Sequence, residues 1–249
     1  VTTGAAFSSP NLGTVTLSWS SGDTVLTVDP NADLTYAAGT DEGSVVATEY
    51  NFNIAATATD VGGTAMESAF SSNFFTLREI TNTLSVYGTL TGAVVSNGTV
   101  QTGAGGDPVV GDHDDDLQRK GFFAFDISGL PIDVEEVTQA EMSSEQMLTL
   151  GNPFTDLGDV SMEHITAAAL DQNAFDVAAL DSIGVYSDSA TDGVRTADVT
   201  TSVADDYDNA RTYSQFRIHF TTATDTDGVT DRTRYNDNDS SLTITYLVP

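Results

Sequence analysis

The feature that most constrains this chain is a period-two alternation of apolar and polar residues, which recurs along its length. The clearest segments are residues 14–19, 50–54, 84–90, 216–220 and 242–246. This period places alternate side chains on opposite faces of an extended strand, so one face is buried and the other is wet. Threonine fills many wet positions because β-branching suits the extended backbone. The pattern predicts an all-β fold, and its many short strands favour an antiparallel β-sandwich.

Glycine, proline and aspartate separate these segments and predict turns, as in residues 21–23 and 103–108. The Ala-rich stretch 165–180 lacks a sustained apolar stripe, so we expect a connection with at most a short helical turn. A change of composition predicts a soft boundary near residue 80. We expect an N-terminal β region over residues 1–80, formed by a donor-strand assembly arm plus a small β domain, and a β-sandwich domain over residues 81–249.

The charge of the chain excludes several classes of protein. Eight Lys and Arg residues stand against 37 Asp and Glu residues, for a net charge of −29, so phosphate backbones repel the chain and nucleic-acid binding is excluded. The absence of cysteine removes disulfides, thiolate metal sites and thiol nucleophiles. No apolar run reaches the roughly 18 residues that a membrane span needs.

The same composition indicates the conditions and the location in which the protein works. Lys120 is the only lysine, and Asp outnumbers Glu. A carboxylate-rich, lysine-poor surface is typical of proteins that work at high salt. The chain begins at Val1 without a signal-like segment, which is expected of a processed product. We therefore expect an extracellular or cell-surface location, and the alternative interpretation is an acidic surface that serves solubility alone.

One region resembles a known family. Residues 111–131 include an aromatic strand that ends in Phe-Asp-Ile-Ser-Gly-Leu-Pro, followed by a strand over 137–150 and an Asp-Val-Thr at 198–200. With the closing strands 215–220 and 242–246, this order is similar to the DNRLRE-type β-sandwich domains of secreted and cell-surface proteins. The resemblance covers about residues 85–248, although the acidic-arginine motif that names the family is only loosely echoed at 231–234. It implies a jelly-roll-like sandwich used in adhesion, carbohydrate binding or structure, without catalysis.

The apolar residues 122–125 of the same region predict a strand independently of this resemblance. Phe123 and Phe125 alternate with Phe122 and Ala124, so both faces of this strand are apolar. We expect a central strand that is covered on both sides.

Two Asp-rich loops are candidate Ca²⁺ sites, because carboxylates in short loops are typical ligands of this hard cation. The first carries Asp225, Asp227 and Asp231 around Gly228, and Asp237 and Asp239 follow closely enough to complete the shell. It resembles the first half of an EF-hand loop, but the distal Glu and the flanking helices are missing. The alternative is a solvated acidic turn.

The second loop is the densest charge cluster of the chain, with Asp112, Asp114 and Asp116 around His113. A lone histidine among carboxylates is a poor Zn²⁺ site, so Ca²⁺ is again the preferred ion. The alternative is a solvated loop held open by repulsion.

No set of catalytic residues assembles around His113, His164 and His219, and no nucleophile, phosphate-loop or zinc motif is present, so we expect no enzyme. Sandwich modules usually hold sugars on exposed aromatic side chains. The candidates in this chain are Trp19 and four tyrosines near loops: Tyr186, Tyr207, Tyr213 and Tyr235. The alternative for these side chains is core packing, which is the more common use of aromatics.

Two functions remain open. The first is a structural subunit that self-assembles into a surface filament or layer, in which the arm over residues 1–19 adds a strand to a neighbour's sheet and Ca²⁺ offsets the charge. The second is a carbohydrate-binding or adhesion module of a secreted protein. The partners are therefore further copies of the chain in the first case and glycans in the second.

Overall fold

The computed structural model describes residues 7–9, 11–20, 25–60, 62–101 and 106–249, apart from the side chain of Trp19. The contacts divide the chain into two compact units. Unit 1 comprises residues 1–80 together with the last three residues, and unit 2 comprises residues 81–246. Arg78 explains why the C-terminus belongs to unit 1, because its Nε donates to the carbonyl of Pro249 at 2.6 Å.

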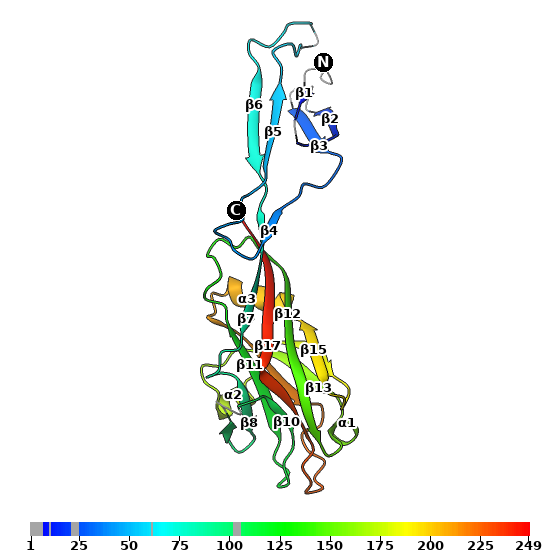
Figure 1. The fold of residues 1–249 in the computed structure, drawn as a ribbon, viewed down its shortest axis with the longest axis vertical. Coiled ribbons are helices and arrows are strands. Elements are labelled where there is room, and N and C mark those ends of the chain that lie inside the picture. Colours follow the sequence, from blue (N-terminus) through cyan, green and yellow to red (C-terminus); the bar gives the residue numbers. More distant parts are fainter. Residues whose placement is uncertain (1–6, 10, 21–24, 61, 102–105) are drawn as a thin grey trace. The chain divides into compact units, whose positions relative to one another are not determined.

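Unit 1 consists of short strands in small sheets (Figure 1). Its strands are β1 (Phe7–Ser8), β2 (Val15–Ser20), β3 (Val25–Pro30), β4 (Ala37–Gly39), β5 (Glu49–Ile54), β6 (Phe70–Phe75) and the start of β7 (Arg78–Ser85). One sheet has the antiparallel order β1-β5-β6, β2 and β3 form a separate hairpin, and β4 runs parallel to β7. The strand expected over residues 84–90 is displaced, because β7 ends at Ser85 and a turn follows.

Unit 2 contains most of the large sheet and all the helices of the described residues. Its further elements are β8 (Gly92–Val95), β9 (Val100–Gln101), β10 (Val109–Gly111), β11 (Arg119–Asp126), β12 (Glu136–Leu150), α1 (Pro153–Asp156), β13 (Val160–Ile165), α2 (Gln172–Asp176), β14 (Asp181–Ser187), β15 (Gly193–Asp198), α3 (Thr200–Asp208), β16 (Tyr213–Phe220) and β17 (Arg232–Val248). The strand order is β14-β13-β16-β11-β10-β17-β12-β15. In addition, β8 pairs with β11 and β7 pairs with β17. The all-β prediction is confirmed, and the jelly-roll topology stays a prediction.

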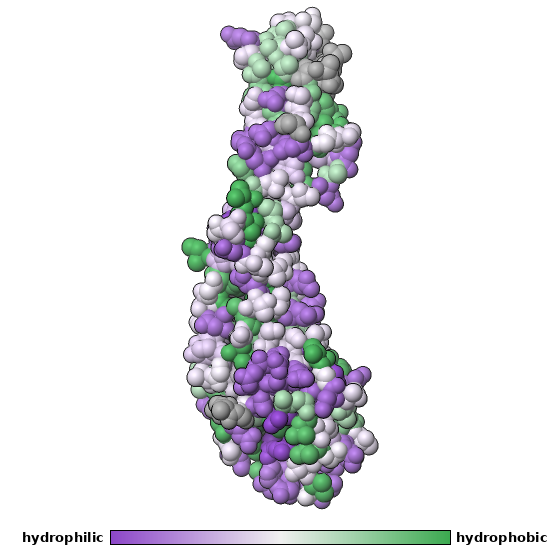
Figure 2. All heavy atoms as spheres, viewed as in Figure 1, coloured by the Kyte–Doolittle hydropathy of each residue, from purple (hydrophilic) through white to green (hydrophobic). Residues whose placement is uncertain are grey.

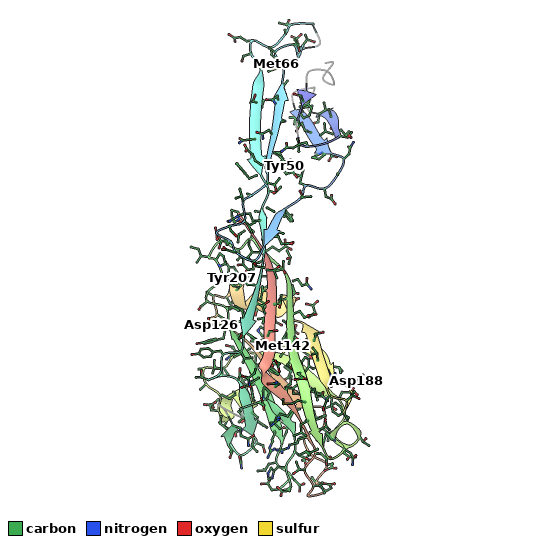
Figure 3. The ribbon with its side chains drawn as sticks, in the orientation of Figure 1. Tyr50, Met66, Asp126, Met142, Asp188 and Tyr207 are labelled. Carbon is green, nitrogen blue, oxygen red and sulfur yellow. The ribbon has the colours of Figure 1, made fainter. Side chains whose placement is uncertain are left out.

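The large sheet folds back on itself around a common core. Tyr186 of β14 and Tyr235 of β17 lie far apart in the strand order, yet their ring centroids are 5.5 Å apart. Phe123 of β11 makes edge contacts with both rings, at 6.5 and 6.3 Å. Met142 of β12 is fully buried (Figure 3). The two halves of the sheet therefore share one apolar interior.

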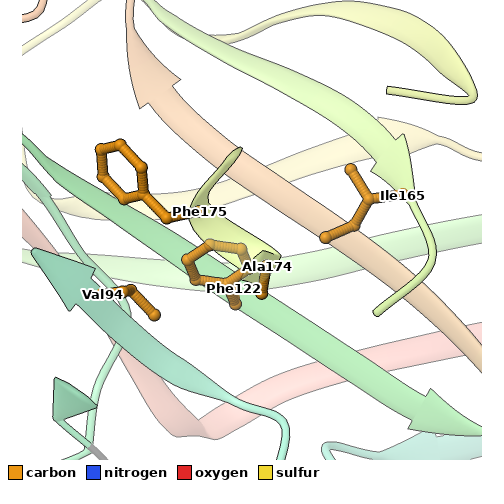
Figure 4. Close-up of a cluster of buried hydrophobic side chains, with 5 residues drawn as sticks. All are labelled: Val94, Phe122, Ile165, Ala174 and Phe175. Carbon is orange, nitrogen blue, oxygen red and sulfur yellow. The ribbon is translucent and has the colours of Figure 1, made fainter. Parts of the chain in front are cut away.

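Strand β11 is covered on both faces, as its apolar sequence predicted. Phe122 points away from that interior into a second cluster, with Val94, Ile165, Ala174 and Phe175 (Figure 4). This cluster packs under α2, the short helix within the expected connection 165–180. Asp171 caps α2 by accepting from two main-chain N–H groups, at 2.8 and 3.1 Å.

Candidate metal centre

Three connections meet at one end of unit 2: β10–β11, β12–β13 with its helix α1, and β16–β17 (Figure 1). The main-chain N–H of Gly228 donates to Asp116 Oδ1 at 3.1 Å, which joins the first connection to the third. The N–H of Asn152 donates to Asp231 Oδ1, which joins the second to the third. Segments that are far apart in the sequence thus form one acidic end.

Asp112 and Asp231 lie at the base of this end, where β10 and β17 pair. The N–H of Asp112 donates to the Asp231 carbonyl at 2.8 Å, and the N–H of Asp231 donates to Asp112 Oδ1 at 3.0 Å. Their exposed fractions are 0% and 2%. Among the described residues, Asp112 Oδ2 finds no hydrogen-bond partner. A buried carboxylate oxygen without a donor is costly, so this atom marks an incomplete site.

Asp231 of this pair also belongs to a triad of carboxylates. One oxygen each from Asp156, Asp225 and Asp231 can be chosen so that all lie within 4.8 Å of one another. Ca²⁺ binds oxygen at about 2.3–2.6 Å, so two ligands of one ion are separated by at most about 5 Å. The spacing of these carboxylates is therefore compatible with a shared Ca²⁺.

The carboxylates of this centre destabilise one another as anions. The pKa of Asp231 is raised, first by burial and then by the charges of Asp112, Asp156 and Asp227. The pKa of Asp225 is also raised, again mainly by desolvation with added repulsion from neighbouring carboxylates. A cation in the centre would remove this penalty.

The backbone around the centre is specialised. Gly151 has φ +70°, and a Cβ at this position would lie 2.7 Å from the Thr230 carbonyl and would also overlap the Asp231 carboxylate. Thr226 and Asp116 adopt positive φ values of 63° and 57°, which are uncommon for residues other than glycine. The β12–α1 loop can thus wrap Asp231 only because residue 151 has no side chain.

The two loops that the sequence presents as separate candidates form one centre. Asp112, Asp116, Asp225 and Asp231 belong to it, and Asp227 contributes its charge while its own carboxylate accepts from the Val229 N–H at 2.7 Å. Asp114 is exposed and pairs with His113. Sequence reasoning missed Asp156, whose only signal is its place after Pro153 in a one-turn helix.

Asp237 and Asp239 are not brought to the centre. They lie within β17, where six residues of extended chain after Asp231 span about 20 Å. The N–H of Asp237 donates to Asp107 Oδ1 at 3.1 Å, and Asp239 accepts from Asn236. The reason is that β17 continues through this segment, so these residues are spread along an extended strand.

A second polar cluster surrounds His164 at the opposite end of β13. His164 Nε2 lies 2.9 Å from Asp206 Oδ1, and Arg211 binds both Asp206 and Asp205. Because the arginine already neutralises these carboxylates, the cluster has less need of a metal than the acidic end. A pocket of about 360 Å³ opens beside it.

The tyrosines considered as sugar platforms are engaged in the fold. Tyr186 and Tyr235 are buried, at 4% and 0% exposure. Tyr207 donates its hydroxyl to the Pro131 carbonyl at 2.7 Å, and Tyr213 packs on Tyr87 with centroids 4.7 Å apart. The side chain of Trp19 lies outside the described part of the chain. Core and edge packing thus accounts for these four tyrosines.

No family model and no curated protein matches the chain, so the resemblance to DNRLRE-type domains stays a prediction. None of the helices formed by the described residues has the length and apolar character that crossing a bilayer requires.

Proposed function

We propose that the protein is an extracellular structural subunit that self-assembles by strand addition and is stabilised by bound cations. The observation that carries this proposal is the three-stranded sheet of unit 1, which has an apolar face that its own chain covers only in part.

The sheet is strongly two-faced. On one face Tyr50 stacks on Phe74 at 5.6 Å, and Phe52 contacts Phe7 and Phe70 at 6.1 and 6.0 Å. The other face is mainly polar, with Glu49, Asn51, Asn53, Ser71 and Asn73, and Phe75 lies at its end opposite Glu49. On the apolar face, Phe70 and Phe74 keep 49% and 37% of their surface exposed. Hydrophobic surface is visible on unit 1 in the space-filling view (Figure 2).

Unit 1 buries few apolar side chains for its length. Among its described residues the buried apolar side chains are Leu12, Tyr50, Ala58, Ile80, Leu247 and Val248. Figure 3 labels Tyr50 at the start of β5 and Met66 in the β5–β6 connection, where Met66 is exposed. A small sheet needs a covering layer for independent stability, so another copy of the chain is the natural source of one.

The strand order supplies a route for assembly. β6 is an edge strand, and β1 on the other edge pairs with β5 through two residues only. An edge of this kind accepts a further strand through main-chain hydrogen bonds. Residues 1–6 and 10 of the expected donor arm lie outside the described residues. The stacking of Phe7 on Phe52 supports this route, because the same contact made by a neighbour's arm would exchange strands between copies.

The test is electron microscopy and sedimentation of the purified protein, with Ca²⁺ and with chelator. We expect polymers with Ca²⁺, and monomers for a Phe70→Ser, Phe74→Ser double variant that keeps its circular dichroism spectrum. The matched control is Ile132→Ser, which removes a fully exposed side chain from unit 2. Wild-type protein that stays monomeric under both conditions, or a double variant that polymerises normally, contradicts the proposal.

A further inference from the structure

We propose that a single Ca²⁺ binds at the acidic end of unit 2, held by Asp156, Asp225 and Asp231, with Asp112 supporting Asp231 through their shared hydrogen bonds, and that it ties the three connections of this end together. The inference deepens the cation requirement of the proposed function, since it names the ion and its ligands. It does not depend on whether the chain polymerises.

The buried oxygen of Asp112 is the independent observation that points to an ion. Asp112 Oδ1 already accepts the N–H of Asp231, a member of the triad, at 3.0 Å, which leaves the buried Asp112 Oδ2 without a donor. Arg119 is also buried nearby, but none of the ion pairs of the described residues joins it to Asp112, and its Nε and Nη1 are themselves unpartnered. The four carboxylates outnumber Arg119 and its neighbour Arg232, which leaves a net negative charge that a divalent cation can neutralise.

The chemistry of the donors selects the ion. Every candidate ligand is an oxygen, and the carboxylates come from irregular loops and a one-turn helix. Ca²⁺ tolerates irregular shells of six to eight oxygens, which main-chain carbonyls and water can complete, whereas Mg²⁺ requires near-octahedral geometry at shorter distances. Zn²⁺ would favour nitrogen or sulfur ligands, and the centre offers neither. We therefore expect Ca²⁺ to bind more tightly than Mg²⁺.

The position of the ion has a structural consequence. Asp112 follows β10, Asp156 ends α1, and Asp225 and Asp231 lie in the β16–β17 connection. An ion shared by the triad crosslinks the second and third connections. The hydrogen bond between Asp231 and Asp112, 119 positions apart in the sequence, extends this link to the first connection. Binding is then coupled to the ordering of this end of unit 2.

The test is calorimetric titration of the chelator-treated full chain with CaCl₂, carried out on the assembly-blocked Phe70→Ser, Phe74→Ser variant so that polymerisation cannot affect the result. We expect one Ca²⁺ per chain. In this background, Asp112→Asn and Asp156→Asn should each weaken binding by at least about tenfold. The matched control Asp188→Asn, at an exposed site (Figure 3), should bind as its parent does.

Asp156 is exposed, so its replacement is compatible with folding even if Asp112→Asn disturbs the buried pair. The proposal is overturned if Ca²⁺ shows no saturable binding, if Mg²⁺ binds equally well, or if a folded Asp156→Asn variant binds like its parent. Ca²⁺ binding by a chain that never polymerises would instead support this site and contradict the proposed function.

Discussion

Asp112 and Asp231 are joined by two hydrogen bonds, from the Asp112 N–H to the Asp231 carbonyl at 2.8 Å and from the Asp231 N–H to Asp112 Oδ1 at 3.0 Å. This pair extends the β10–β17 ladder by one position and places two carboxylates side by side in a buried site. Repulsion between them is tolerable only if a cation or a proton compensates it. The stability of unit 2 should therefore respond to metal ions and to pH.

Calcium should raise the thermal stability of unit 2. A ligand present at 100 times its dissociation constant stabilises the folded state by about 2.7 kcal/mol, which corresponds to about 5–10 °C in Tm for a chain of this size. The measurement is near-ultraviolet circular dichroism, which follows the buried Tyr186 and Tyr235 of unit 2, with Ca²⁺ and with chelator. Equal Tm values under both conditions would contradict the expectation.

The pH dependence should change sign when Ca²⁺ is removed. In the folded protein, Asp225 and Asp231 have pKa values above the ordinary value of 3.8. The folded state therefore binds more protons than the unfolded chain in the window above 3.8, and the contribution of these groups to stability falls as pH rises through it. With Ca²⁺ the trend reverses, because the ion binds the deprotonated carboxylates. Urea titrations between pH 4 and 7, with Ca²⁺ and with chelator, compare the wild type with Asp225→Asn. The variant should show a smaller fall of stability with rising pH in chelator, and a smaller rise in Ca²⁺.

Gly151→Ala should damage the centre without removing a ligand. The added Cβ is strained at φ +70° and would overlap Asp231 and approach the Thr230 carbonyl. We expect a loss of about 1–3 kcal/mol from the free energy of unfolding, together with weaker Ca²⁺ binding. Gly129→Ala is the control, because a Cβ there meets no atom within 4 Å, and it should change stability by less than about 0.5 kcal/mol. Equal effects of the two substitutions on stability would show that the backbone conformation at residue 151 does not require glycine.

The strands of unit 2 could be predicted from the sequence because their periodicity is a local property. The alternation over residues 216–220 and 242–246 lies within β16 and β17, and the apolar run Phe122–Phe125 forms the doubly covered part of β11. Helix α3 had no such signal, since its sequence is rich in threonine and aspartate. Its burial of Val203 and the link from Asp206 to His164 are tertiary contacts that outweigh weak local propensity.

The metal centre could be predicted only in part, because its residues are brought together by tertiary contacts that local sequence does not reveal. The density of aspartate identified residues 112–116 and 225–231, but no local pattern indicates that Asp112 pairs with a residue 119 positions away. Asp156 joins them because α1 turns the chain back toward β17, and that depends on the close approach at Gly151. Asp237 follows Asp231 closely in the sequence, but it lies away from the centre because an extended strand moves sequence neighbours apart by about 3.3 Å per residue.

Glu163 should make unit 2 sensitive to acid. Its pKa is lowered to about 2, first by the hydrogen bond with His219 and further by Arg217, against the opposing effect of burial. The folded-state pKa lies below the ordinary value of 4.5, so Glu163 stabilises the protein above pH 4.5, and this contribution is lost as pH falls from 4.5 toward 2. Arg217 also donates to the carbonyls of Ala174, Phe175 and Val177, so the ion pair holds the end of α2.

Glu163→Gln should therefore lower the free energy of unfolding by about 2 kcal/mol at pH 6, because Arg217 loses its charged partner at a largely buried site. At pH 2.5 the difference between the variant and the wild type should shrink to a small part of its value at pH 6, because most of the stability that Glu163 contributes is lost between pH 4.5 and its folded-state pKa of about 2. Chemical denaturation at both pH values checks this, with the exposed Glu135→Gln as the control. A difference between Glu163→Gln and wild type that is the same at both pH values would assign the effect to packing, because a loss of packing does not depend on the ionisation of Glu163 whereas a loss of its charge does.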